Sequence, residues 1–380
     1  MPRFSGPGSV TELNGGAVKF DLYYEMMASD DWTDESEQRL YSQVLDQVAF
    51  ADEMGFSTIW FVRHHARAGY AHSPTPEVVF GALSQRTERI RFGFGVEVLP
   101  YHHPMYVAER VAVVDVLSGG RVECGTGRGS GAELAGEILG IPAEEAKPRW
   151  LESVKLLPEL WTKRDVVHQG EFWSWDRPQT VVPHPAQKPH PPLWSAASSP
   201  ESVVDTGKYQ LGLLTSGYTA LGEIAKNVDA YRAAFAASEE PIGYVPNDRV
   251  AAATTWLCHE PGDVATAERL RTAVLGWARR DITRGHGRRS LKATEVQLGK
   301  SRSEMTDDEL LNNETGLVRV GDPEYFLEAT RRYSDAGVDH LMLQMQLSNL
   351  SHEDTMRSIE LFGRHIIPAG SEVGRDAVAV

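Results

Sequence analysis

The chain has 380 residues, of which 41% are hydrophobic, and this length suits one large α/β domain with insertions. Its 53 acidic and 38 basic residues give a formal net charge of −15, which argues against nucleic-acid and anionic-membrane binding because both require a basic surface. Two cysteines, Cys124 and Cys258, are too few for a disulfide framework, so a reducing, cytoplasmic compartment is expected.

Strand-like and helix-like segments alternate along residues 18–368, after a polar, glycine-rich stretch, 1–17, that is predicted to be a flexible tail rather than a signal peptide. The predicted strands are 18–25, 58–62, 90–98, 121–126, 193–197, 210–215, 250–258 and 338–344. Because helical segments follow the strands, we predict a single (β/α)₈ TIM barrel with its active site at the carboxyl ends of the strands. No apolar run approaches the ~18 residues of a membrane span.

Histidines follow two of the predicted strands. The second strand runs into Arg63, His64 and His65, and the third is followed by His102 and His103. Adjacent residues on an extended backbone point in opposite directions, so neither histidine pair readily shares one ion. The sequence also lacks the H-x-H and H-E-x-x-H patterns, and we predict no metal site.

The third strand has an unusual alternation. One face carries a bulky apolar set, which is predicted to pack under helices: Ile90, Phe92, Phe94, Val96 and Val98. The opposite face, which we expect to face the barrel lumen, carries Gly93, Gly95 and Glu97. Bare glycines leave room beside the backbone for a flat ligand, and a bulge or tight barrel packing is the alternative explanation.

Two further segments suit a phosphate group. Glycines at 125, 127, 129 and 131 surround Arg128 in a turn after the fourth strand, with a spacing that differs from the dinucleotide-binding G-x-G-x-x-G. Such a turn offers backbone N–H groups and a guanidinium. Ser198, Ser199 and Ser202 open the helix after the fifth strand, where hydroxyls either bind phosphate or simply cap the helix.

Three segments depart from the barrel pattern. Residues 166–191 are rich in aromatic residues and proline, which predicts an excursion outside the barrel. Residues 280–315 are first basic and then acidic, and they form either a solvated loop or a lid near the barrel mouth. Residues 369–380 are predicted to be a C-terminal tail.

In this order, the segments resemble the bacterial luciferase-like family of flavin-dependent monooxygenases. The matching pieces are WFVRHH after the second strand, the run from IRFGFGVEVLPYHHP to VECGTGRG, PPLWSAASSPES, and the closing GDPEYFLEAT, AGVDHLMLQ and SIELFGRHIIP. Together they extend from about residue 18 to residue 368. The long central match is specific. The short matches are weak singly, but together they are informative because they occur in the order that the family has.

The resemblance implies roles for particular residues. His64 is expected to be the active-site histidine beside the flavin ring, and Gly95-Val96 to form a non-prolyl cis peptide under it, with Glu97 in the same cofactor-binding set. Arg128 is expected to grip the FMN phosphate. The serines expected to help it are Ser198, Ser199 and Ser202.

Two positions depart from the family pattern. The family often has an acidic residue where this chain has Arg63, and usually an apolar one where it has Glu97. We expect these two side chains to pair across neighbouring strand ends, with consequences for substrate choice.

The resemblance implies an FMNH₂-dependent, two-component monooxygenase that inserts one atom of O₂ into a small organic substrate through a flavin C4a-peroxide. A separate NAD(P)H flavin reductase is then the partner, and a homodimer through residues 76–118 is expected. The alternatives are an F420-dependent oxidoreductase, a non-catalytic flavin-binding protein and a metal-dependent barrel hydrolase. The aromatics Trp60, Phe61, Trp173 and Trp194 belong either to the substrate pocket or to the core.

Overall fold

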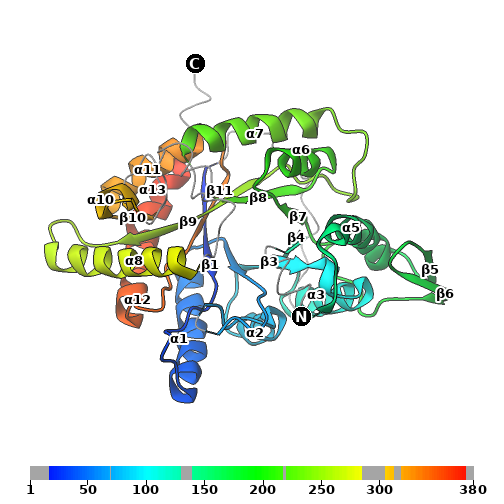
Figure 1. The fold of residues 1–380 in the computed structure, drawn as a ribbon, viewed down its shortest axis with the longest axis horizontal. Helices are drawn as coiled ribbons and strands as arrows, with labels where there is room; N and C mark the ends of the chain where they lie inside the picture. The colour runs from blue at the N-terminus through cyan, green and yellow to red at the C-terminus, as the bar shows by residue number, and fades with distance from the viewer. Residues whose placement is uncertain are drawn as a thin grey trace, which may run out of the picture.

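Eight parallel strands close into a barrel surrounded by helices (Figure 1). The computed structural model describes residues 17–68, 70–129, 139–216, 220–284, 304–311 and 318–373. The barrel strands are β1 (Lys19–Tyr24), β2 (Thr58–Phe61), β3 (Arg91–Val98), β4 (Val122–Gly127), β7 (Leu193–Ala196), β8 (Gly212–Ser216), β9 (Val250–Cys258) and β11 (His340–Leu343). They are neighbours in that order, and β11 pairs with β1 to close the ring. The predicted (β/α)₈ barrel is confirmed.

Helices cover the outside of the barrel, as the alternating pattern predicts. Their bounds are α1 (Asp34–Glu53), α2 (Pro76–Ser84), α3 (Pro104–Leu117), α5 (Ala146–Thr162), α6 (Pro200–Lys208), α7 (Leu221–Ala236), α8 (Val264–Arg284), α10 (Asp307–Leu310), α11 (Pro323–Asp335), α12 (His352–Leu361) and α13 (Ile367–Val373). Short polar side chains begin several of them: Thr33 accepts a hydrogen bond at the start of α1, and Asp322 at the start of α11. None of the helices in the described part of the chain is long and apolar enough to cross a membrane.

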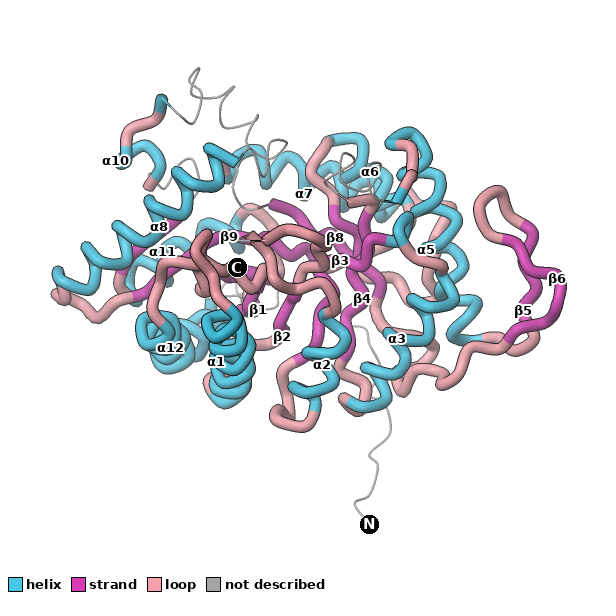
Figure 2. The backbone as a smooth tube through the Cα atoms, turned by 60° about the horizontal axis from the view of Figure 1, so that its bottom comes forward, coloured by secondary structure: helices cyan, strands magenta, loops and turns pink. Residues whose placement is uncertain are grey.

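The predicted excursion contains a hairpin. β5 (Val166–Gln169) and β6 (Ser174–Gln179) pair antiparallel in a sheet of their own, which stands away from the barrel beyond α5 (Figures 1 and 2). A further strand that the sequence pattern did not predict, β10 (Val318–Gly321), pairs with β9. It has only four residues, too few for a clear alternation.

Several predicted segments fall wholly or partly outside the described residues. These include the tail 1–17 except for its last residue, and most of the candidate lid 280–315. A helix that the sequence pattern also predicts, near Ala132 to Leu139, lies outside them except for its last residue. At the other end of the chain, α13 continues to Val373, within the segment predicted to be a tail.

Aromatic side chains fill the barrel interior below the strand ends. Trp60 and Trp194 are fully buried and pack edge to face, with ring centroids 5.4 Å apart. A Cβ atom added at Gly93 would lie 2.2 Å from the Trp60 ring, so Gly93 makes room for Trp60. The expectation of open space beside both lumen glycines is therefore wrong at Gly93. A Cβ atom at Gly95 would meet nothing closer than 3.5 Å.

Buried polar groups hold these two indoles in place. The Trp60 N–H donates to Asp21 at 2.9 Å, and the Trp194 N–H donates to Glu123 at 2.7 Å. Burial alone raises the pKa of Glu123, but the guanidinium groups of Arg249 and Arg91 lower it to about 2. The Glu123 carboxylate is thus ionised at neutral pH. The interior beneath the candidate site is filled by the hydrogen-bonded side chains of Trp60 and Trp194.

Candidate functional site

The predicted site residues follow four strands that are neighbours in the barrel. His64 follows β2, Gly95 and Val96 lie near the end of β3, Arg128 follows β4, and the serine cluster follows β7. Parallel strands bring their carboxyl ends to one rim. The structure therefore places these residues along a single arc of the barrel mouth.

The end of β3 departs from simple alternation. The Gly95–Val96 peptide bond is cis, as the resemblance implied, and the pairing of β3 with β4 shifts register between Phe94 and Glu97. A one-residue shift moves every later side chain to the opposite face. Val96 consequently packs on the interior aromatic cluster instead of under the helices. Gly95 and Val96 remain partly exposed at the mouth.

Glu97 is turned to the outer face by the same shift. Its side chain is fully buried, and its two carboxylate oxygens accept hydrogen bonds from Arg63 Nη2 at 2.6 Å and Arg110 Nη2 at 2.7 Å. The expected Arg63–Glu97 pair is confirmed. The expectation that the Glu97 side chain faces the lumen is wrong, so its side chain does not line the open site.

Glu77 completes a four-charge cluster with Arg63, Glu97 and Arg110. Arg63 donates to Glu77 Oε2 at 2.5 Å and, through Nη1, to the carbonyl oxygen of Pro74 at 2.9 Å. Burial disfavours both charged forms, yet the opposite charges outweigh it, so the pKa of Glu97 is lowered and that of Arg63 is raised. All of these interactions tie the ends of β2 and β3 to α2 and α3.

His64 lies on the side of the mouth nearest β1. It is half-buried, with its ring 5.6 Å from that of Tyr70, and its backbone N–H donates to the carbonyl oxygen of Ser73 at 3.3 Å. The Tyr70 hydroxyl donates to Glu25 at 2.8 Å. Glu25 ends the first predicted strand, so the strand-end rule that selected His64 applies equally to Glu25, which was not among the predicted site residues.

His65 and His102 are neighbours at the barrel mouth, but among the described residues no three His, Cys, Asp or Glu side chains are placed to hold one metal ion. The ring centroids of His65 and His102 are 5.9 Å apart. Burial is the larger cause and the nearby charge of Arg110 the next, and together they lower the pKa of His102 to about 4. The pKa of His65 is lowered as well, by burial and then by Arg63. Both rings are expected to be neutral at physiological pH.

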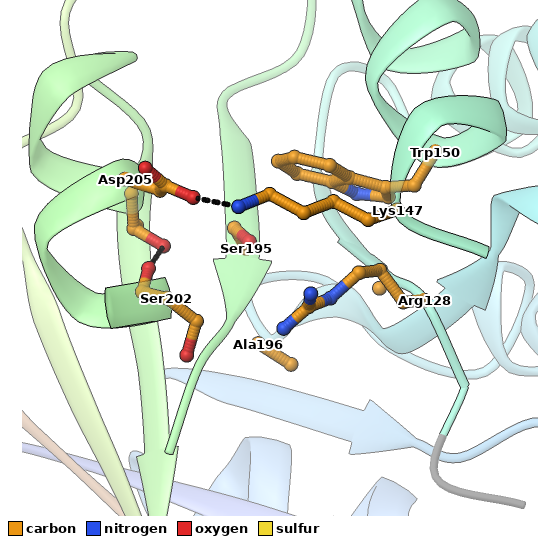
Figure 3. A pocket seen from close by; sticks show the side chains of 9 residues that line it. Arg128, Lys147, Trp150, Ser195, Ala196, Ser202 and Asp205 are labelled. Carbon is orange, nitrogen blue, oxygen red and sulfur yellow. Dashed lines mark hydrogen bonds and ion pairs between the residues drawn. The ribbon is translucent and has the colours of Figure 1, made fainter. Parts of the chain in front are cut away.

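A small pocket opens at the ends of β4 and β7 (Figure 3). Its lining residues are Gly127, Arg128, Lys147, Trp150, Ser195, Ala196, Ser202, Asp205 and Thr206. The Arg128 side chain points into it from the β4 side, toward Ala196 and the start of α6. Within the described part of the chain, its guanidinium makes no hydrogen bond or ion pair. A Cβ atom at Gly127 would lie 2.7 Å from Val96, so the pocket adjoins the partly exposed end of β3.

The three serines have different positions. Ser199 caps α6, and its hydroxyl and that of Ser202 each accept a hydrogen bond from the other residue's backbone N–H, at 3.3 and 3.1 Å. Ser202 also lines the pocket, whereas Ser198 is exposed and lies outside the pocket lining. The capping role is confirmed, and of the three only Ser202 faces the pocket.

Two charged residues in this pocket, Lys147 and Asp205, were not predicted from the sequence. Lys147, in the first turn of α5, has its ammonium 2.8 Å from Asp205 and 2.6 Å from Glu201, both on α6. The hydrogen bond to Asp205, followed in size of effect by the one to Glu201, raises the pKa of Lys147. No motif marks Lys147, and its ion pairs depend on where the fold places α5 relative to α6.

A family model described as luciferase-like monooxygenase matches residues 26–340, most of the chain. The chain belongs to the luciferase-like monooxygenase family. It is 33% identical over 186 residues to the oxygenase component of the flavin-dependent trigonelline monooxygenase of Acinetobacter baylyi, a match that covers 49% of this chain and 50% of that relative. Limonene 1,2-monooxygenase of Rhodococcus erythropolis is 28% identical over 332 residues, which cover 86% of this chain and 80% of the relative.

The proteins to which this chain is similar are named for different cofactors. An F420-dependent glucose-6-phosphate dehydrogenase of Microbacterium testaceum is 31% identical over 189 residues, covering 48% of this chain and 54% of the relative. Among solved structures, the FMN complex of the oxygenating constituent of 3,6-diketocamphane monooxygenase from Pseudomonas putida has a TM-score of 0.78 at 17% identity, covering 93% of this chain and 98% of that chain. At this identity the similarity shows the shared fold.

Proposed function

We propose that this chain is the oxygenase of a two-component monooxygenase, which uses reduced FMN and O₂ to oxidise a small organic molecule. One observation carries the proposal: Arg128, which has no partner among the described residues, points toward the start of α6 in a pocket that adjoins Gly95 and Val96. A guanidinium beside a helix N-terminus suits a phosphate monoester. The partly exposed backbone at the end of β3 suits a flat ring. The residues present therefore fit FMN.

Each residue has a distinct part in this proposal. Bound reduced FMN supplies the reactivity toward O₂ that protein side chains lack. Arg128 and Ser202 bind and orient the phosphate, and the Gly95–Val96 backbone supports the ring. His64 carries an imidazole, which can both donate and accept a proton, and it gives or takes a proton at the substrate. The buried side chains of Trp60 and Trp194 exclude water from the interior side of the site.

The proposal implies a second protein. A two-component enzyme receives its reduced flavin from a separate NAD(P)H-dependent reductase, and the relative from Acinetobacter baylyi is named as an oxygenase component. The substrate is proposed only as a small organic molecule, since the relatives named for trigonelline and limonene act on chemically different compounds.

Titration of the protein with FMN, reduced FMN and F420 tests the proposal. We expect binding of the FMN forms with an affinity well above that for F420, and O₂ consumption that depends on FMNH₂ and a reductase. Tight F420 binding without O₂ consumption would instead support the F420-dependent oxidoreductase, which the F420-dependent relatives favour as the second candidate. Tight FMN binding with no O₂ consumption by the reduced complex would indicate a non-catalytic flavin-binding protein.

We also propose a homodimer formed through α2 and α3. Large apolar side chains on this face are exposed: Val78, Tyr106, Val113, Val116 and Leu117. Residues 106, 113 and 117 recur at helical spacing on α3, and α2 packs beside it, so the patch is continuous enough for a second copy to cover. Tyr106→Glu is expected to shift the protein from dimer to monomer in analytical ultracentrifugation. An unchanged sedimentation mass would contradict this interface.

A further inference from the structure

The phosphate pocket has a balanced charge before any ligand enters it. Arg128 and Lys147 contribute two positive charges, and Asp205 and the neighbouring Glu201 contribute two negative ones. A phosphate monoester brings about 1.5 to 2 further negative charges near neutral pH. An acidic pair next to a phosphate site opposes binding, so its presence requires an explanation.

Lys147 lines the phosphate pocket and also pairs with the two carboxylates. It reaches across the pocket from α5, above Arg128, and its ammonium is turned toward Asp205 on α6 (Figure 3). Its side chain is 42% exposed and carries three N–H donors on a flexible stem, so it can change partners without moving the backbone. Arg128 lacks such competing carboxylates among the residues described.

We propose that Glu201 and Asp205 compete with the FMN phosphate for Lys147, and that this competition keeps the flavin exchangeable instead of permanently bound. The inference rests on the proposed function, because exchange matters only if a reductase delivers the flavin. With the pocket empty, Lys147 neutralises the two carboxylates. When phosphate enters, Lys147 shares its donors between them and the phosphate, and the remaining carboxylate charge weakens binding.

A purely structural explanation of the same contacts makes a different prediction. If Lys147 only clamps α5 to α6, then removing the lysine or removing the carboxylates breaks the same clamp. Both changes should then impair FMN binding in the same direction. Competition for Lys147 instead predicts effects of opposite sign.

The experiment compares FMN and riboflavin affinities by fluorescence titration in three variants. The double variant Glu201→Gln/Asp205→Asn is expected to bind FMN about three- to tenfold more tightly, because it removes two negative charges beside the phosphate site. Lys147→Met should bind FMN about three- to tenfold more weakly, and Lys147→Arg should retain most of the affinity. Riboflavin, which lacks the phosphate, should bind all of them like the wild type. The FMN release rate in stopped-flow measurements should fall in the double variant.

Lys208→Met is the matched control, because it removes a comparably exposed lysine at the far end of α6, where Lys208 pairs with Glu240. It should leave both affinities unchanged. If the wild type binds FMN and the double variant binds it equally or more weakly, this inference is wrong and the proposed function is unaffected. Failure of the wild-type protein to bind FMN at all overturns the proposed function, and this inference with it. Melting temperatures of each variant identify any loss that comes from misfolding.

Discussion

Replacement of Arg128 by alanine is expected to weaken FMN binding by about 100-fold while riboflavin binding stays within about twofold of wild type. The guanidinium is half-buried, points into the pocket and has no competing partner among the described residues. It can therefore give both of its parallel N–H groups to a phosphate. Charge-assisted hydrogen bonds of this kind contribute about 1.5–3 kcal/mol each, and one such bond with part of a second accounts for the expected loss. Fluorescence titration of both flavins measures it.

Two further variants separate charge from geometry at this position. Arg128→Lys keeps the positive charge but loses the planar fork, so an intermediate FMN affinity is expected. Arg149→Ala, on the neighbouring helix α5, removes an arginine that pairs with Glu145 outside the pocket and should change neither affinity. Equal losses of FMN and riboflavin binding in Arg128→Ala would mean that Arg128 does not hold the phosphate.

The barrel could be predicted because each strand and helix has its own local signal. All eight barrel strands were predicted to within about two residues, since buried parallel strands are short apolar runs bounded by glycine and polar residues. The rule that function gathers at the carboxyl strand ends then selected His64 and Arg128 as candidates. That rule needs only chain order, not packing.

The face of a side chain near the end of β3 could not be predicted in the same way. Alternation holds as far as Phe94, and the register shift before Glu97 then reverses it, so Val96 faces inward and Glu97 outward. Periodicity cannot locate such a shift from within the strand. The cis peptide at Gly95-Val96 was expected only from the family resemblance.

Packing between distant elements explains the remaining omissions. Glycines were interpreted as room for a ligand, but Gly93 accommodates Trp60 on the adjacent strand, a contact that depends on strand pairing. Arg63–Glu97 was predicted because both residues end neighbouring strands. Arg110, on α3, was missed because nothing in the sequence shows which helical side chain reaches a given strand.

Glu97→Gln is expected to lower the free energy of unfolding by about 3 kcal/mol, because it leaves Arg63 and Arg110 sharing a single carboxylate, Glu77, in a buried cluster. The loss should appear as a lower urea midpoint. It should also depend on pH. The folded-state pKa of Glu97 is lowered, so its ionisation stabilises the fold above the ordinary glutamate pKa of about 4.3, and this contribution disappears as pH falls below that value. Wild type and variant should therefore converge in acid.

The double variant Arg63→Met/Glu97→Leu distinguishes charge pairing from simple packing. It removes one charge of each sign and leaves Arg110 and Glu77 as a balanced pair, already 3.9 Å apart. Its stability should lie within about 1.5 kcal/mol of wild type, although each single change alone costs about 3 kcal/mol, which corresponds to strong coupling between the two positions. Fully additive losses would contradict the pairing. Because the cluster includes Arg63, next to His64, and Glu97, shortly after Gly95, the single variants should also bind FMN more weakly. The balanced double variant should recover much of that affinity.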